Sequence, residues 1–591
     1  MLETLTVKSV EPYEDLPYEW VSATAEFAVD PADPANARIV DLDRAPRGAD
    51  GRVRFDADVR LLRPVRGGNG RALFTVPNRG MTMGLPFNGP SDTLLSPLTF
   101  DPTAVPPAGD AFLLRRGWTI AWCGWQWDVL RSSGALGLTA PVAEVEPGRL
   151  RVEFRPDFDQ AEHALSDSSP LARFSEYPTA DVHDPEATLT VRTAPMATAR
   201  IVPRSEWRFT SPTSFAIDGG FRAFHTYRLV YRSSFAPVVG AGLLALRDFG
   251  AHLRAEHEYV FASGVSQCGR ALRQFLFEGL NVDESGAQVF DGVFSLIASA
   301  RRGEFNQRYG QPGLTHPLTP AYGAPLDTTA LLARQRAIGG TPKIMFTNSS
   351  WEYWRGDAAL IHQDARTGED LPEDPDARAY LIAGTDHIGR VPELKKLMPT
   401  ANPGNDLEPA LALRALFVQL EQWVCDGLEP APSQVPRRAD GTATTREHVL
   451  DRIRAAFPDA ALPDVDYLPW TPIIDPDSTA CPVELGDPLI ALVSDVDEHG
   501  NEIAGIRLPD LAAGTAAYTG WNPRAHIDGL PDVLYEMMGS HLSPRTPAAP
   551  DHSAIRDAAN ALVDKRFLLP QDLDQAIANA TGHTPDLPGA E

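Results

Sequence analysis

The strand-to-helix stretch EYVFASGVSQCGRALRQFL, residues 258–276, constrains the fold of this chain more than any other segment. A short apolar run ends near Gly264, and from Leu272 onward apolar residues recur at helical spacing. The link between them, GVSQCG, is one residue longer than the Gly-x-Ser-x-Gly turn that presents a serine hydroxyl between a strand and a helix. Its central Ser266 is therefore either a nucleophile or a serine that caps the helix.

Apolar strands and helical segments alternate on both sides of this stretch. Such alternation predicts an α/β fold with a mostly parallel sheet and helices on both faces. We expect this core to span residues 67–428, with strands within 71–80, 117–128, 258–264, 288–300, 341–350 and 377–387, and helices at 238–256, 266–280 and 406–427.

Three further regions surround or interrupt the predicted core. Residues 1–66 show period-2 patterns and are expected to form a β-rich N-terminal segment. Short alternating strands between Pro- and Asp-rich turns indicate a β-rich insertion at residues 131–235. A proline-rich linker, residues 429–438, precedes a C-terminal extension, residues 439–591, which we expect to pack on the core.

The strand ends supply the groups that would activate a serine. A serine hydroxyl needs a base to take its proton and a carboxylate to orient that base. In the α/β-hydrolase arrangement these groups follow in the order Ser, acid, His. Here Glu352 follows the strand within 341–350, and His387 follows the next strand. We therefore predict Ser266 as nucleophile, Glu352 as acid and His387 as base.

Other residues compete for these roles. Asp357 remains open as the acid because it follows Glu352 closely, and Glu304 remains open because it follows the preceding strand. Four further residues are expected to have no catalytic role. Asp364 should lie on a helix surface, Asp386 in a turn, and His316 and His362 on the surface or in a pocket.

An ester-cleaving site also needs two backbone N–H groups for the developing oxyanion. We expect one from Gln267, at the positive end of the helix dipole. The other should come from the loop around Arg79 and Gly80, where glycine permits a close approach. Cys268 takes the place of the usual second glycine and is expected to be a small buried side chain rather than the nucleophile.

Two residues are candidates for substrate contacts. Trp125 belongs to a run of four tryptophans that ends a strand, and this run forms either core packing or an apolar wall for the substrate. Arg302 follows another strand with Arg301, and this pair either binds a substrate carboxylate or forms an ion pair with Glu304.

Composition narrows the class of function. The 591 residues carry a formal net charge of -26 without a basic stripe, which argues against nucleic acid as a partner. No signal peptide, membrane span or zinc pattern is visible, and the four cysteines are dispersed. The segment DVDEHGNE, residues 495–502, lacks the glutamate of a calcium loop and favours a hairpin turn. We expect a cytoplasmic protein that needs no metal or organic cofactor.

Several segments resemble those of a large bacterial family of α/β-hydrolase domain-containing proteins: GVSQCGRALRQFLFEGLN, NSSWEYWRGDA, VPNRG, GWQWD and DEHGNEIAGIRLP…YTGWN. The resemblance covers nearly the whole chain. The usual family form after the serine is Gln-Ser-Gly-Arg, whereas this chain has Gln267-Cys268-Gly269-Arg270. The serine turn is also similar to that of glucuronoyl esterases. This resemblance implies serine-dependent ester hydrolysis on an α/β-hydrolase core, without implying a substrate.

The sequence therefore predicts a serine hydrolase that cleaves a small-molecule carboxylic ester or lactone through an acyl-enzyme intermediate. Two alternatives remain open at this point. One is an acyltransferase that uses the same three residues, and the other is a non-catalytic binding protein on a hydrolase scaffold.

Overall fold

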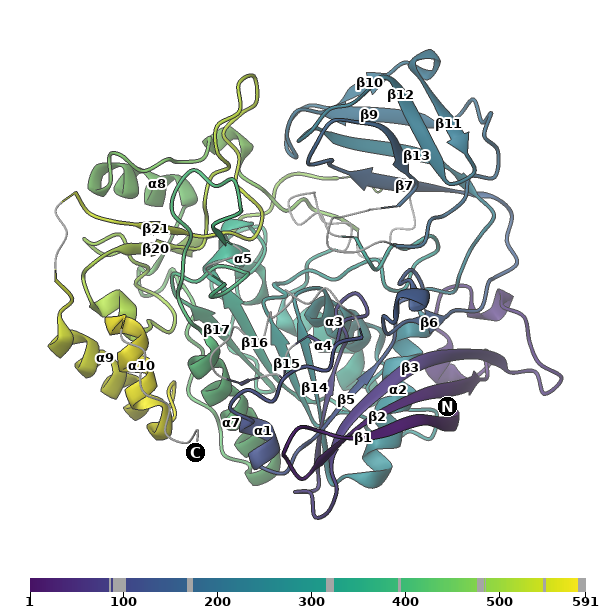
Figure 1. The fold of residues 1–591 in the computed structure, drawn as a ribbon, viewed down its shortest axis with the longest axis horizontal. Helices are drawn as coiled ribbons and strands as arrows, with labels where there is room; N and C mark the ends of the chain where they lie inside the picture. Colours follow the sequence, from purple (N-terminus) through teal and green to yellow (C-terminus); the bar gives the residue numbers. More distant parts are fainter. Residues whose placement is uncertain are drawn as a thin grey trace.

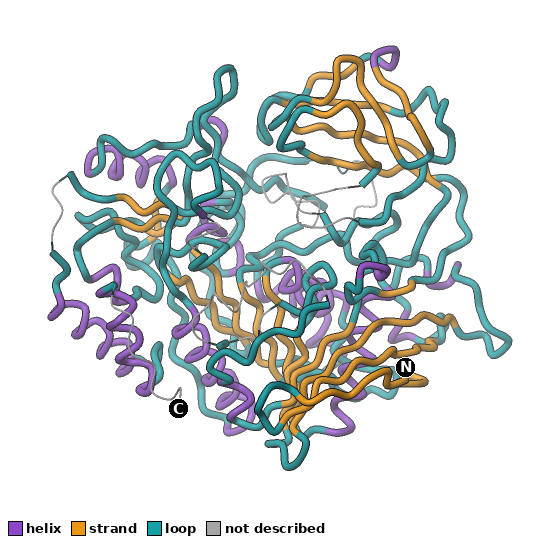
Figure 2. The backbone as a smooth tube through the Cα atoms, in the orientation of Figure 1, coloured by secondary structure: helices purple, strands orange, loops and turns teal. Residues whose placement is uncertain are grey.

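A ten-stranded mixed sheet organises the chain in the computed structural model, which describes residues 1–83, 85, 87–88, 103–166, 174–314, 324–391, 395–475, 483, 485–545 and 549–582 (Figures 1 and 2). The strand order is β1-β2-β3-β5-β4-β14-β15-β16-β17, and β6 pairs with β3. The strands are β1 (Leu2–Pro12), β2 (Tyr18–Val29), β3 (Val53–Pro64), β4 (Arg71–Thr75), β5 (Thr119–Cys123), β6 (Leu138–Thr139), β14 (Tyr259–Val265), β15 (Gly292–Leu296), β16 (Lys343–Ser349) and β17 (Ala377–Ile382).

Strand direction divides this sheet into two parts. From β5 through β4 and β14 to β17 every neighbouring pair is parallel, as predicted for the core. The strands of residues 1–66 are antiparallel, and β3 pairs with β5, so they extend the same sheet. The predicted α/β fold with a mostly parallel core and a β-rich N-terminal region is confirmed.

Period-2 alternation along the parallel strands builds a separate core on each face of the sheet. One face packs against α2 (Ala241–Glu256), α3 (Gln267–Glu278) and α4 (Thr328–Ile338). The opposite face packs against α7 (Ala410–Asp426) and the short α1 (Phe112–Arg115). Consecutive residues point to opposite faces: Phe74, Ala262, Val293 and Ile344 to the first, and Leu73, Phe261, Phe294 and Met345 to the second.

The β-rich insertion forms two small antiparallel sheets that stand apart from the central sheet (upper right in Figure 1). Aromatic side chains fill the space between them, with Phe154 stacked on Tyr227 and in edge contact with Phe215. The strands are β7 (Gly148–Phe154), β8 (Gln160–Ala164), β9 (Thr188–Arg192), β10 (Arg200–Val202), β11 (Trp207–Ser211), β12 (Ser214–Phe221) and β13 (Thr226–Ser233).

The C-terminal segment packs on the β17 edge of the sheet and on α7. Ile506 forms a parallel bridge with Ile382, and Asp572 accepts a 2.7 Å hydrogen bond from Arg414 of α7. Its elements are β18 (Ala443–Thr444), α8 (Arg446–Ala456), β19 (Val493–Ser494), β20 (Ala517–Thr519), β21 (Ser540–Leu542), α9 (His552–Asp564) and α10 (Leu573–Thr581).

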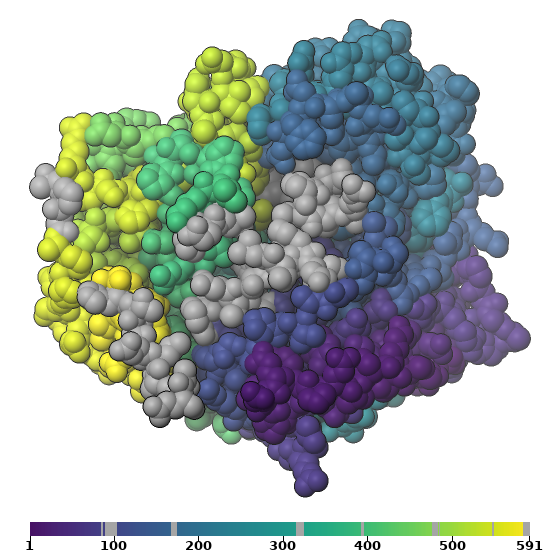
Figure 3. Space-filling view, viewed as in Figure 1, coloured from purple at the N-terminus to yellow at the C-terminus, as the bar shows by residue number. Residues whose placement is uncertain are grey.

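The C-terminal segment also meets the insertion, and the two lie against each other in the space-filling view (Figure 3). Glu536 forms ion pairs with Arg155 of the insertion and with Arg524. Arg524 also lies 4.4 Å from the ring centroid of Phe224. The insertion and the C-terminal segment therefore contact each other through charged and aromatic groups.

Residues 495–502, which were expected to form a hairpin turn, do form one. Val496 bridges Glu502, and the Asp497 carboxylate accepts hydrogen bonds from the backbone N–H groups of His499 and Asn501, each at 3.0 Å. Within the described parts of the chain, every helix is too short or too polar to cross a lipid bilayer.

Candidate active site

Three side chains from separate strand ends meet at the carboxyl edge of the parallel sheet. Ser266 follows β14, Glu352 lies in α5 (Ser350–Trp354) directly after β16, and His387 follows β17. Nε2 of His387 lies 2.9 Å from Oγ of Ser266, and Nδ1 lies 2.5 Å from Oε1 of Glu352. The chain therefore places a hydroxyl, an imidazole and a carboxylate in one hydrogen-bonded row.

The serine sits in a sharp and strained turn. Ser266 has φ 57° and ψ -113°, a region that non-glycine residues seldom occupy. It holds the N-cap position of α3, but its side chain gives this described helix no capping hydrogen bond. Its backbone N–H instead donates to the carbonyl of Leu296 at 2.8 Å. Capping by the hydroxyl, the alternative raised from the sequence, is therefore not what the side chain does.

Close backbone packing explains the glycines of this turn. A Cβ atom at Gly264 would lie 2.5 Å from the carbonyl carbon of Cys268, so only glycine fits there. A Cβ atom at Gly269 would lie 2.6 Å from the Cβ of Ala298 on the neighbouring strand end. The late second glycine is thus needed for contact between α3 and the segment after β15.

Cys268 fills the place of the usual second glycine as a buried thiol. Its Sγ donates to the carbonyl of Pro77 at 3.2 Å, and the side chain is fully buried. Burial raises the pKa of the Cys268 thiol to about 12. A thiol in this state carries little thiolate at neutral pH, which is the form that reacts.

The Glu352 carboxylate is fixed on both sides. Its Oε2 accepts hydrogen bonds from the backbone N–H of Ser349 at 2.9 Å and from the Ser349 hydroxyl at 2.6 Å. Together with the cap of α5 this is a capping box, so the same carboxylate that contacts His387 also starts the helix. Glu352 is fully buried, and its orientation is set by local sequence.

The competing carboxylates lie in other ion pairs. Asp357 accepts from Arg355 at 3.1 Å and also pairs with Arg301. Glu304 forms an ion pair with Arg151 of the insertion and accepts a 3.1 Å hydrogen bond from the backbone N–H of Gln311. Among the described residues, neither carboxylate forms a hydrogen bond or ion pair with His387, whereas Glu352 does.

The other candidate acids and bases within the described residues are engaged in contacts away from the three-residue row. The Asp364 carboxylate accepts hydrogen bonds from the backbone N–H groups of Arg366 and Thr367. His362 lies 3.0 Å from the hydroxyl of Tyr353, and burial lowers the pKa of its imidazole to about 3. His316 lies outside the described residues.

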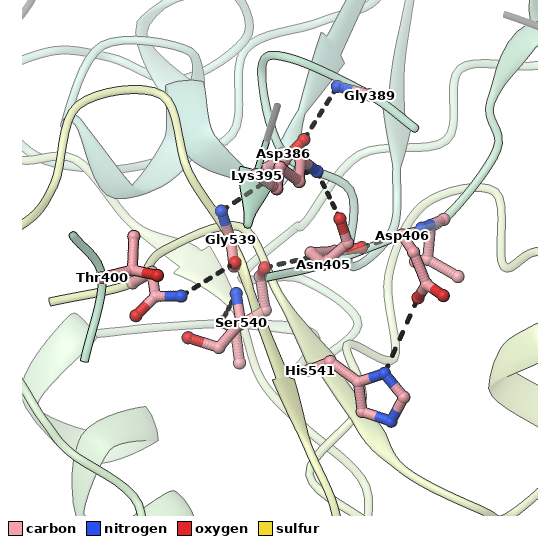
Figure 4. A network of polar contacts seen from close by, with 12 residues as sticks. Asp386, Gly389, Lys395, Thr400, Asn405, Asp406, Gly539, Ser540 and His541 are labelled. Atoms are coloured by element: carbon pink, nitrogen blue, oxygen red, sulfur yellow. Dashed lines mark hydrogen bonds and ion pairs between the residues drawn. The ribbon is translucent and has the colours of Figure 1, made fainter. Parts of the chain in front are cut away.

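Asp386, next to the histidine, belongs to a buried polar network (Figure 4). Its Oδ2 accepts from Nζ of Lys395 at 2.6 Å and from the N–H of Gly539 at 3.0 Å, while Oδ1 accepts from Gly389 at 2.8 Å. Lys395 also donates to the carbonyl of Asn405. This network ties the loop that carries His387 to the C-terminal segment.

Glu502 is a residue that sequence reasoning did not single out. One carboxylate oxygen accepts from Ser350 Oγ and the other from the N–H of Gly384, both at 2.7 Å. Ser350 begins the helix of Glu352, and Gly384 precedes His387 by three residues. Burial raises the pKa of Glu502 to about 7. Only tertiary structure brings this distant residue beneath both loops.

The loop expected to supply an oxyanion donor runs beside the serine turn. Val76 donates its N–H to Ser263 at 2.9 Å, and the Asn78 side chain donates to Val265 at 3.3 Å. Arg79 and Gly80 both have positive φ, at 51° and 79°. A Cβ at Gly80 would lie 2.7 Å from a methyl group of Val129, so the glycine is sterically required.

The other predicted contact residues are buried. Trp125 is 2% exposed and donates its indole N–H to the carbonyl of Pro77 at 2.9 Å, beneath the same loop. Arg302 is 5% exposed, lies 3.8 Å from the ring centroid of Phe277 and donates to Gln274 at 3.3 Å. Gln267 is fully buried with its side-chain amide donating to Pro312. Substrate contact by Trp125 and Arg302 stays a prediction.

An apolar pocket lies beside His387 at the same edge of the sheet. Its apolar wall comes from the ends of three strands and from α7: Val265, Leu296, Ile297, Ile382, Pro409 and Leu413. The described residues contain no cluster of His, Cys, Asp or Glu suited to holding a metal ion.

Comparison with solved structures gave weak similarity to glucuronoyl esterases. One from Solibacter usitatus shares 10% identity at a TM-score of 0.25, over 59% of this chain and 68% of that chain. One from Teredinibacter turnerae T7901 shares 10% identity at a TM-score of 0.22, over 61% and 64%. No curated protein matches the chain. The family model described as "Alpha/beta hydrolase domain" matches residues 242–578, which is more than half of the 591 residues. The chain therefore belongs to the alpha/beta hydrolase domain family.

Proposed function

We propose that this protein is a serine hydrolase that cleaves a carboxylic ester or lactone, with Ser266, His387 and Glu352 as its catalytic residues. The observation that carries the proposal is the row of contacts from Ser266 Oγ to His387 Nε2 at 2.9 Å and from His387 Nδ1 to Glu352 at 2.5 Å. Membership of the alpha/beta hydrolase family is consistent with this chemistry.

The proposed reaction uses these atoms in turn. Ser266 Oγ attacks the ester carbonyl carbon while Nε2 of His387 takes the hydroxyl proton. The imidazolium then gives that proton to the leaving alkoxide, and an acyl group remains on Ser266. His387 next removes a proton from water, the resulting hydroxide attacks the acyl carbon, and Ser266 leaves with the proton. Glu352 orients the imidazole and stabilises its positive charge throughout.

The oxyanion of each tetrahedral intermediate needs preorganised donors. We assign the backbone N–H of Gln267 at the start of α3, where the helix dipole is positive, and the backbone of the Arg79–Gly80 loop. The contacts of Val76 and Asn78 with β14 hold this loop beside the turn and support the assignment. The apolar pocket beside His387 suits the acyl or alcohol part of the substrate.

The same residues could transfer the acyl group to an alcohol instead of water. Product analysis separates the two reactions, because an acyltransferase gives mostly a new ester when an alcohol is added. We propose hydrolysis as the main reaction and expect free acid to remain the dominant product.

A fluorophosphonate probe tests the proposal, because it phosphonylates only an activated serine. We expect one adduct per chain at Ser266, located by mass spectrometry, and loss of that adduct in Ser266→Ala. Ser263→Ala is the matched control, since this hydroxyl lies on the same strand 3.2 Å from Thr75 Oγ1. An absence of labelling in the folded protein would favour a binding protein, and an adduct at Cys268 would identify a different nucleophile.

A further inference from the structure

Arg270, next to the serine turn, carries a guanidinium that has no hydrogen-bond or ion-pair partner among the residues that the structure describes. It follows Ser266 by one helical turn, and its backbone N–H donates to the Ser266 carbonyl at 3.1 Å. Among the described residues the Arg270 side chain makes no hydrogen bond or ion pair, although it is only partly exposed. Buried or half-buried arginines are normally paired, so this exception requires an explanation.

The position of Arg270 on the helix directs it toward the reaction centre. Residues four apart lie on the same helix face with their Cβ atoms about 5–6 Å apart. Side chains on a helix lean toward its N-terminus. A long side chain at Arg270 therefore covers the turn before it, which is the turn that carries Ser266.

Further positive charge surrounds this guanidinium. Arg79, Arg301 and Arg355 come from the loop after β4, the segment after β15 and the end of α5, all at the carboxyl edge of the sheet. Burial, followed by the repulsion from these like charges, lowers the pKa of Arg270 to about 9. Four guanidinium groups at the carboxyl edge of the sheet therefore lie close enough to repel one another.

One carboxylate within electrostatic reach of Arg270 is already bonded to other arginines. That carboxylate, Asp357, pairs with Arg355 at 3.1 Å and also with Arg301. Asp357 is fully buried, and because it is bonded to these two arginines, no carboxylate among the described residues pairs directly with Arg270. An uncompensated cation in partly dehydrated surroundings is costly, and an incoming anion removes that cost.

We propose that Arg270 binds a carboxylate carried by the substrate, so that the preferred substrate is an anionic ester such as a monoester of a dicarboxylic acid. This inference rests on the proposed function, because it assigns the substrate class of that site. Arginine suits the task since its planar fork can bind a carboxylate through two parallel hydrogen bonds. Arg79, across the serine turn, adds positive charge to the same region.

The first test compares two esters that differ only in charge. Mono-4-nitrophenyl adipate and 4-nitrophenyl hexanoate have the same acyl length, but only the first ends in a carboxylate. We expect the wild-type protein to prefer the adipate, and Arg270→Gln to lower this preference by about 10- to 100-fold in kcat/KM, mainly through KM. Arg270→Lys should keep part of the preference. Arg208→Gln is the charge-matched control, because Arg208 is exposed on the insertion and pairs with Asp218.

A second measurement does not depend on turnover. Binding of monomethyl adipate to Ser266→Ala protein should be detectable by calorimetry and weakened about tenfold or more by adding Arg270→Gln. Thermal unfolding without ligand should show an unchanged or higher Tm for Arg270→Gln, because the change removes a repelled cation. A large drop in Tm would reveal an internal partner for Arg270 and overturn the proposal.

The outcomes separate this inference from the proposed function. Equal loss of activity on both esters in Arg270→Gln would mean that Arg270 serves the reaction centre and not a substrate carboxylate. Inhibition of hexanoate hydrolysis by inorganic phosphate, without any preference for adipate, would assign the site to a free anion. Both results overturn the inference while leaving hydrolysis intact. Failure of Ser266 labelling, with adipate binding retained, would overturn only the proposed function.

Discussion

Oε1 of Glu352 lies 2.5 Å from Nδ1 of His387, while Oε2 of the same carboxylate is held by the N–H and hydroxyl of Ser349. One side chain therefore begins a helix and contacts the imidazole. A fixed acceptor at Nδ1 places the proton of the neutral ring on that nitrogen and leaves Nε2 free to accept the serine proton.

Glu352→Gln should lower kcat for a neutral 4-nitrophenyl ester by about 10³- to 10⁴-fold with little change in KM, because the neutral amide no longer fixes the tautomer or stabilises the imidazolium. Steady-state kinetics on folded protein is the measurement. Asp357→Asn is the comparison. It should cost about 3–5 kcal/mol of stability by leaving Arg301 and Arg355 without their shared carboxylate, but the folded fraction should keep its kcat. The reverse pattern would make Asp357 the acid.

The Cys268 thiol should be unreactive in the folded protein. Because burial raises its thiol pKa to about 12, iodoacetamide at pH 7.5 should leave Cys268 unmodified in the folded protein, and mass mapping after denaturation should find it alkylated. Cys268→Ala should retain fluorophosphonate labelling at Ser266, at a cost of roughly 1 kcal/mol for the lost sulfur contacts. Loss of labelling in this variant would contradict the assignment of Ser266.

Gly264→Ala tests the steric basis of the serine turn. The added methyl would stand 2.5 Å from the backbone of Cys268, so the turn must open and Ser266 must move away from His387. We expect at least a hundredfold loss of kcat/KM, since a displacement of about 1 Å costs about that much. Gly219→Ala lies in open space on β12 with φ +81° and should lower stability by roughly 1 kcal/mol without affecting kinetics. Full activity in Gly264→Ala would show that the turn tolerates a side chain.

Glu502 should control stability in a pH-dependent way. Burial raises its pKa from 4.5 to about 7, so the folded state binds this proton more tightly than the unfolded state. Its contribution to stability is therefore fully present below pH 4.5 and is lost as the pH rises to about 7. We expect Glu502→Gln to abolish this change, so that its unfolding free energy relative to wild type rises by about 3 kcal/mol between pH 5 and pH 8, measured by urea denaturation. A constant difference across this range would contradict the argument.

Glu502 should also position the segments that lead to Glu352 and His387. Glu502→Ala removes both acceptors, for Ser350 and for Gly384, and should lower kcat more than it changes KM. Glu502→Gln can still accept from the Gly384 N–H and donate to the Ser350 hydroxyl, so its kcat should stay within about threefold of wild type. A purely structural role would lower Tm in Glu502→Ala without changing kcat of the folded enzyme.

The sequence by itself determined the elements and the three strand ends that meet. Apolar runs bounded by turn residues marked β14 to β17 and the helices α2, α3 and α7, because burial on both faces leaves a continuous apolar signature. The helix α4 was not predicted. The order Ser266, Glu352, His387 followed from that periodicity, since parallel strands deliver their carboxyl ends to one edge.

Tertiary structure alone decided which charges pair and which do not. The sequence favoured Glu352 as the acid but left Asp357 and Glu304 open, because all three lie near strand ends. Only packing pairs Asp357 with Arg301 and Arg355, Glu304 with Arg151, and Glu352 with His387. The contact of Glu502 with the loops before Glu352 and His387 joins segments more than a hundred residues apart. That Arg270 has no partner among the described residues was likewise visible only in the tertiary structure. The spacing of apolar residues along the sequence indicates which residues are buried together. Hydrogen bonds and ion pairs instead depend on distances of a few ångströms, which only the folded chain sets.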